Sequence, residues 1–172
     1  MGTGGRRPSD PRAAAVLARF TAAFGDTAQP IPVDRIACDL MGLRIELSHE
    51  IEVSGLLIPE TMRVYVNAKE AAESEGRRRF TIAHEIGHWV CQCDEGRVPP
   101  PEPIMCRDAD LDDGVNKERE TEANNFAASL LMPEPAVRAA AAEGLDHEQA
   151  AERFVVSDVA MRWRYYNLGI NT

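Results

Sequence analysis

The chain has 172 residues, 44% of them hydrophobic, which is enough for one buried core and short for two enzyme domains. Its formal net charge of −9 repels nucleic acid and anionic membranes at long range, so we expect neither as a direct partner. The sequence shows no apolar run near the roughly 18 residues of a membrane span and no apolar segment of a secretory signal, and four cysteines are too few for a disulfide framework. We therefore predict a cytoplasmic protein.

A single folded domain is predicted over residues 10–172, after a disordered segment at residues 1–9. Within this domain, residues 10–29 hold an N-terminal helix and its connection, and residues 133–172 form a helical tail. We find no internal repeat that would divide the domain further.

The first helix is expected from Asp10 to Phe24, and Gly25 ends it. Its apolar side is predicted to hold Ala14, Leu17 and Ala18, with the ring of Phe20 close by. Two prolines then interrupt the chain before a second, shorter helix, which is expected from Val33 to Met41.

Three short strand candidates follow, and their alternating pattern predicts a small three-stranded antiparallel sheet. They are Leu43–Leu47, Ser54–Ile58 and Met62–Asn67. The last strand lies directly before the next helix, and we expect a peptide substrate to lie extended along its edge as an added strand. The predicted substrate-binding residues are therefore Arg63, Val64, Tyr65, Val66 and Asn67.

A helix from about Ser74 to Cys91 carries the pattern His84-Glu85-Ile86-Gly87-His88. Residues four apart lie one turn above each other, so His84 and His88 can direct two imidazole nitrogens at one metal ion. Glu85 lies about 100° round the helix from His84, beside the coordination position left open for water, where its carboxylate can act as general base. Five residues can also match this pattern by chance, so it needs the support of a third ligand.

The helix predicted from Asn116 to Met132 supplies this third ligand. Its buried face is defined, at 100° per residue, by Ala123, Phe126, Ala127, Leu130 and Leu131. Glu120 projects into this face, whereas Glu122 lies on the opposite one with Glu118, Asn125 and Ser129. A carboxylate that points into a core needs a partner, and a metal ion provides one. Two imidazoles and one carboxylate with an open position predict one zinc ion per chain.

Asn124 lies one turn beyond Glu120 on nearly the same side of this helix. It is suitably placed to accept a hydrogen bond from the far ring nitrogen of a ligating histidine, and we predict this supporting role. An ordinary capping or surface asparagine is an alternative of about equal weight.

The thiols Cys91, Cys93 and Cys106 form another candidate metal group. The first two are separated by one residue, whereas zinc sites use a spacer of at least two, and no fourth ligand is evident. We therefore expect buried or idle thiols.

Two segments together resemble the paired signature of the ImmA/IrrE family of metallo-endopeptidases. They are Arg79–His88 (RFTIAHEIGH) and Glu120–Pro133 (ETEANNFAASLLMP), and the similarity extends more weakly over about residues 30–170. The resemblance implies an α+β, zincin-like domain with a thermolysin-like zinc core, in which two core helices bear the metal ligands. It further implies a cytoplasmic regulatory protease that cuts a helix-turn-helix repressor of the phage or stress-response type.

The alternative from another class is a non-catalytic or latent regulatory binding module. In that case the metal would be structural and the chain would act through protein–protein contacts. The intact set of His84, Glu85, His88 and Glu120 favours the enzyme.

Overall fold

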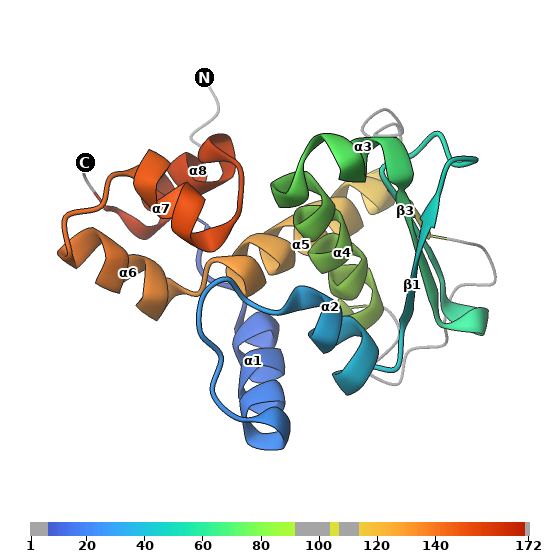
Figure 1. Cartoon of the computed structure of the whole chain (residues 1–172), viewed down its shortest axis with the longest axis horizontal. Coiled ribbons are helices and arrows are strands. Elements are labelled where there is room, and N and C mark those ends of the chain that lie inside the picture. Colours follow the sequence, from blue (N-terminus) through green and yellow to red (C-terminus); the bar gives the residue numbers. More distant parts are fainter. Residues whose placement is uncertain (1–6, 92–103, 107–113, 171–172) are drawn as a thin grey trace.

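Two helices, α4 (Glu75–Trp89) and α5 (Gly114–Leu131), form the centre of the fold in the computed structural model, which describes residues 7–91, 104–106 and 114–170. The sheet lies on one side of this pair and the C-terminal helices lie on the other (Figure 1). A Cβ atom on Gly87 would lie 3.1 Å from both the Cα atom and the carbonyl oxygen of Ala123. The backbones of α4 and α5 therefore meet at a point where α4 has no side chain.

The core surrounds this central pair. The buried face of α5 contains the predicted residues Ala123, Phe126, Ala127, Leu130 and Leu131. The same core contains buried residues of α4 and of the sheet, which packs on α4, among them Ile82, Ile86, Leu57, Val64 and Val66. None of the helices in the described part of the chain is long and apolar enough to cross a membrane.

The described residues form one four-stranded sheet with the order β1-β3-β2-β4. The strands are β1 (Arg44–Ser48), β2 (Gly55–Ile58), β3 (Arg63–Asn67) and β4 (Ile104–Cys106). Strand β2 is antiparallel to both β3 and β4, whereas β1 runs parallel to β3. The predicted α+β class, with a small sheet and a helical C-terminal region, is confirmed.

The sheet differs from the predicted three-stranded antiparallel one in its fourth strand and in its parallel pair. The connection between β1 and β2, residues 49–54, crosses the end of β3, so β1 lies on the far side of β3 from β2. Asn67 holds this crossing: its side-chain amide donates to the carbonyl of Ile51 at 3.0 Å, and its backbone N–H donates to that of Ser54 at 2.9 Å. Alternation along a strand indicates which face is buried, and it does not indicate which strand lies beside it.

The predicted substrate edge along Arg63–Asn67 is wrong, because β3 lies inside the sheet. Its two edges pair with β1 and β2, so it offers no free row of backbone groups to a peptide. Val64 and Val66 are buried in the core, and the guanidinium of Arg63 donates to the hydroxyl of Tyr65 at 3.3 Å. The side chain of Asn67 caps the next helix, α3 (Ala68–Glu73).

Helix α1 (Pro11–Phe24) packs on α5 through a face shifted from the predicted one. Its buried residues are Ala13, Val16 and Phe20, whereas Ala14 and Ala18 are exposed. Alanines occupy several sides of this helix, so composition alone does not define the buried face and tertiary packing decides it. The next helix, α2 (Val33–Arg35), continues as a π-helical segment over Ile36–Leu40.

Residues 7–9, which were predicted to be disordered, lie against the C-terminal half of the chain. The hydroxyl of Ser9 donates to the carboxylate of Glu134 at 2.9 Å. The backbone N–H of Asp10 donates to the hydroxyl of Ser129 at 2.9 Å. This contact explains why Ser129 is buried, although its helix phase predicts exposure.

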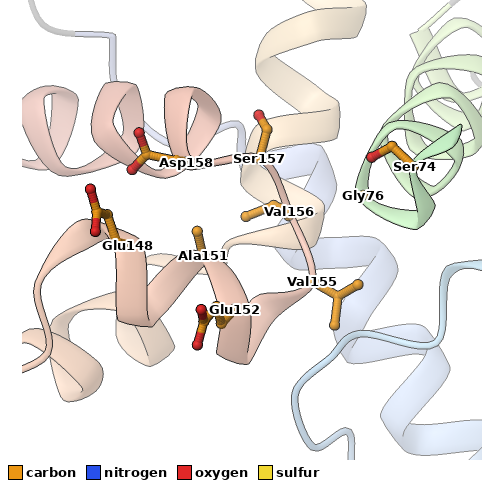
Figure 2. Close-up of a pocket in the computed structure, with 9 residues that line it drawn as sticks. All are labelled: Ser74, Gly76, Glu148, Ala151, Glu152, Val155, Val156, Ser157 and Asp158. Atoms are coloured by element: carbon orange, nitrogen blue, oxygen red, sulfur yellow. The ribbon is translucent and has the colours of Figure 1, made fainter.

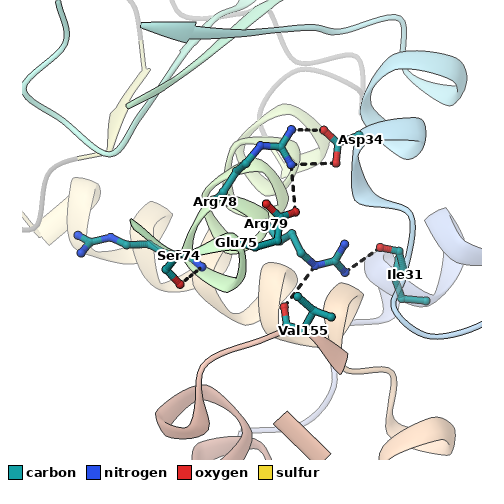
Figure 3. Close-up of polar contacts among 8 residues, drawn as sticks. Ile31, Asp34, Ser74, Glu75, Arg78, Arg79 and Val155 are labelled. Atoms are coloured by element: carbon teal, nitrogen blue, oxygen red, sulfur yellow. Dashed lines mark hydrogen bonds and ion pairs between the residues drawn. The ribbon is translucent and has the colours of Figure 1, made fainter. Parts of the chain in front are cut away.

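The C-terminal region consists of α6 (Glu134–Ala142), α7 (His147–Phe154) and α8 (Asp158–Leu168). The α7–α8 turn lies close to the beginning of α4, where Arg79 is only 6% exposed (Figure 3). The Arg79 guanidinium donates to the carbonyl of Ile31 at 2.8 Å and to that of Val155 at 3.3 Å. Arg79 therefore joins α4 to the segment before α2 and to the α7–α8 turn.

Arg79→Ala should lower the free energy of unfolding by about 2–3 kcal/mol, because it removes a packed side chain and its hydrogen bonds to two carbonyls. The Ile31 carbonyl keeps the N–H of Val33 as a donor at 2.8 Å, so the Val155 carbonyl is the more affected of the two. The matched change Arg77→Ala, in the same helix, should cost less than about 1 kcal/mol, because Arg77 makes an exposed ion pair with Glu70 at 3.0 Å. Urea unfolding of the two variants measures both values. Equal losses would show that Arg79 does not hold these segments together.

Candidate metal centre

Three side chains that could hold a metal ion converge where α4 and α5 meet. His84 and His88 are buried one turn apart on α4, with ring centroids 4.6 Å apart. Glu120 reaches them from α5: its Oε2 lies 3.1 Å from Nε2 of His84, and its Oε1 lies 3.1 Å from Nε2 of His88. Potential ligand atoms of the three residues all lie within 4.8 Å of one another. The two helices thus bring two nitrogens and a carboxylate to one point.

The orientation of His84 gives a test of whether this point suits a metal ion. Its Nδ1 lies 2.9 Å from Oδ1 of Asn124 on α5. An amide oxygen can only accept, so Nδ1 donates and carries the ring proton, and in the neutral ring Nε2 is then an acceptor. That nitrogen faces an oxygen of Glu120, which is also an acceptor. A cation between the two atoms satisfies both, so this donor set fits a zinc ion with a further position for water.

The charges of the donors also suit a cation. Burial alone would raise the pKa of Glu120, but the neighbouring imidazoles of His84 and His88 outweigh burial and lower the pKa from 4.5 to about 2. Burial lowers the pKa of His88, an effect that Glu120 only partly opposes. The set therefore offers an anionic carboxylate and a neutral imidazole, which are the forms that bind metals.

Glu85 lies beside the three donors and is 0% exposed. Among the described residues, neither of its carboxylate oxygens has a hydrogen-bond partner. Desolvation raises the pKa of Glu85 from 4.5 to about 8; the charge of His84 opposes this rise and that of Glu120 adds to it. A carboxyl group with a pKa near neutrality can both take up and return a proton.

Sequence reasoning missed Gly55 of β2, which lies against both Glu85 and Thr81 of α4. A Cβ atom on Gly55 would lie 2.5 Å from Oε1 of Glu85 and 2.7 Å from Cγ2 of Thr81. Strand β2 therefore passes directly over the carboxylate. The available signal was a glycine inside a predicted strand, which often marks a close approach of backbone to another group.

The other carboxylates of α5 stay outside this centre. Glu118 and Glu122 are exposed on the outer side of the helix. Of the candidate thiols, Cys91 is buried. Cys93 and the side chain of Cys106 lie outside what the structure describes, so the three thiols do not form a described metal group.

A separate pocket of about 450 Å³ lies between the beginning of α4 and the α7–α8 turn (Figure 2). Glu148, Glu152 and Asp158 line it, and His147 joins two of them in a second group of potential ligands. Asp158 already accepts hydrogen bonds at both oxygens, from His147 at 2.5 Å and from Arg162 at 3.0 Å. It also opens helix α8, where the helix dipole stabilises a carboxylate without any metal. These contacts account for the group as a polar network.

Comparisons with known proteins cover the part of the chain that carries these side chains. The family of IrrE N-terminal-like domains matches residues 41–165, which include His84, His88 and Glu120. The radiation response metalloprotease IrrE of Deinococcus radiodurans is 36% identical over 88 residues, which are 48% of this chain and 23% of that protein.

A solved structure described as a Mycobacterium tuberculosis transcriptional regulator has the same fold. It matches with a TM-score of 0.59 and 21% identity, over 88% of this chain and 45% of that one. The chain thus spans less than half the length of either relative. Because the family matches most of the chain and includes both motif helices, this chain belongs to the IrrE N-terminal-like family of peptidase domains, as its resemblance to ImmA/IrrE proteins implied.

Proposed function

We propose that the chain is a zinc-dependent endopeptidase with one zinc ion, held by His84, His88 and Glu120, and with Glu85 as general base. The observation that carries this proposal is the convergence of the three donors at 3.1 Å contacts beside a fully buried carboxylate. The Deinococcus relative is named a metalloprotease, which supports the reaction class. When bound, zinc supplies a Lewis acid that polarises the peptide carbonyl and makes a water molecule more acidic.

Residues of the chain hold the metal ligands in position and transfer the proton. Asn124 holds the ring of His84 by accepting from Nδ1, so Nε2 keeps its lone pair for the metal. Glu120 stays anionic because its pKa is lowered to about 2. Glu85 takes the proton of the attacking water on a carboxylate oxygen and passes it to the leaving amine, which needs a pKa near neutrality.

The substrate that we propose is a helix-turn-helix repressor of transcription, cleaved in the cytoplasm. The motif pair at Arg79–His88 and Glu120–Pro133 supports this class, because the family it resembles contains regulatory proteases of that kind. We also propose that residues 10–172 act as one domain. The hydrogen bonds of Asp10 to Ser129 and of Arg164 to the carbonyl of Met132 at 2.9 Å support this unit.

Glu85→Gln should abolish proteolysis while the zinc content stays near that of the unchanged chain. Glutamine keeps the size of the side chain but cannot accept the proton of the water. Peptide cleavage and metal analysis of the same purified samples test both halves. Cleavage by a zinc-loaded Glu85→Gln variant would remove the proposed base.

Glu120→Ala and Glu122→Ala form a matched pair, two residues apart on one helix. Glu120→Ala removes a proposed ligand, so this variant should lose most of its zinc affinity and all of its activity. Glu122→Ala removes an exposed side chain and should change both only slightly. Competition with a coloured zinc chelator measures the affinities without reference to activity. The reverse order would mean that the donor set proposed here is wrong.

A helix-turn-helix repressor encoded beside this chain should be cut by the zinc-loaded protein at a defined peptide bond. The Glu85→Gln variant and a chelator-treated sample are the controls, and both should leave the repressor intact. Mass spectrometry of the products locates the cut. Efficient cleavage of unrelated proteins with the repressor left intact would contradict the proposed substrate class.

A further inference from the structure

Strand β2 crosses the motif helix at Gly55 with no room for a side chain. The position where Gly55 would carry a Cβ atom is 2.5 Å from Oε1 and 3.2 Å from Cδ of Glu85, and 2.7 Å from Cγ2 of Thr81. Contacts below about 3.0 Å are not tolerated at a real Cβ atom, so any larger residue forces something to move. The backbone of Gly55 has no positive φ, so the strand itself does not require glycine.

The group that a side chain at residue 55 would displace is the carboxylate of Glu85. Strand β2 is held on both sides, since Gly55 lies opposite Val66 of β3 and Cys106 of β4. Thr81 is buried and β-branched, which limits its χ1 angle in a helix. The carboxylate of Glu85 is at the end of a flexible side chain. It is therefore the group that a Cβ atom at residue 55 would displace first, although it is fully buried.

Gly87 shows by contrast why Gly55 is not simply a packing residue. The nearest atoms to a Cβ on Gly87 are the Cα atom and carbonyl oxygen of Ala123, which belong to the backbone of α5. A substitution there would displace a whole helix and with it Glu120. At Gly55, the nearest atom is an oxygen of the proposed base itself.

We propose that Gly55 is a positioning residue for Glu85: its missing side chain leaves the space that the carboxylate occupies beside the metal ligands. A side chain at residue 55 pushes the carboxylate out of line with the attacking water and leaves His84, His88 and Glu120 in place. The catalytic consequence of this inference rests on the proposed protease function, whereas the packing of Gly55 against Glu85 does not.

A stability cycle tests this packing without any substrate. In the zinc-loaded full chain, Gly55→Ala should lower Tm by about 3–6 °C. In a Glu85→Ala background, where the oxygen is absent, the same change should lower Tm by less than about half as much. Additive losses would overturn the proposal. If Gly55→Ala alone fails to fold, the double variant should still fold, and failure of both would also overturn it.

Kinetics of the same variant test the catalytic consequence. Gly55→Ala should keep a zinc content near that of the unchanged chain and an unchanged KM, while kcat falls about 100-fold, because a misplacement of roughly 1 Å has that effect. The neighbouring change Ser54→Ala, which leaves the Gly55 space untouched, should keep kcat and zinc near the unchanged values. An unchanged kcat, or a loss of zinc in step with activity, would overturn the proposal. If the unchanged chain cleaves nothing, the protease function fails, and the stability cycle still decides whether Gly55 accommodates Glu85.

Discussion

The contact between α4 and α5 at Gly87 is the constraint on which the candidate metal centre depends. Two histidines one turn apart on α4 supply two donors that point the same way. The third donor comes from another helix. The position of a Cβ on Gly87 lies 3.1 Å from the Ala123 backbone, so the helices meet as closely as their backbones permit. Glu120 precedes Ala123 by about one turn, so the separation of the helices sets its distance from both imidazoles.

Different neighbours give the two glutamates of this group opposite pKa shifts. The carboxylate of Glu120 faces two imidazoles, and these contacts keep its pKa near 2. Glu85 has no such partner among the described residues, and burial raises its pKa to about 8. Two carboxylates whose pKa values are pushed apart are suited to different tasks, one as a permanent anion and the other as a proton carrier.

Helix periodicity explains how much of this arrangement could be predicted from the sequence. The phase that separates Glu120 from Glu122 is a property of the helix alone, and so is the pairing of His84 with His88. The order of strands in a sheet does not follow from the sequence of any single strand. The position of β1, for example, depends on a loop held by Asn67. The space over Glu85 depends in the same way on two elements that meet only in the folded chain. The phase of α1 was missed because its alanines mark no preferred face.

Arg79 ties the C-terminal helices to the same rigid body that carries the donors. It precedes His84 by five residues, about 7.5 Å along the axis of α4, and it is bonded to the α7–α8 turn through the carbonyl of Val155. Undocking that turn would leave a buried guanidinium with one acceptor fewer. If docking of the turn and loading of the metal each restrict α4, then by thermodynamic linkage each favours the other to the same degree. Metal affinity would then depend on whether the α7–α8 turn is docked. That turn lies on the opposite side of the central helices from the sheet (Figure 1).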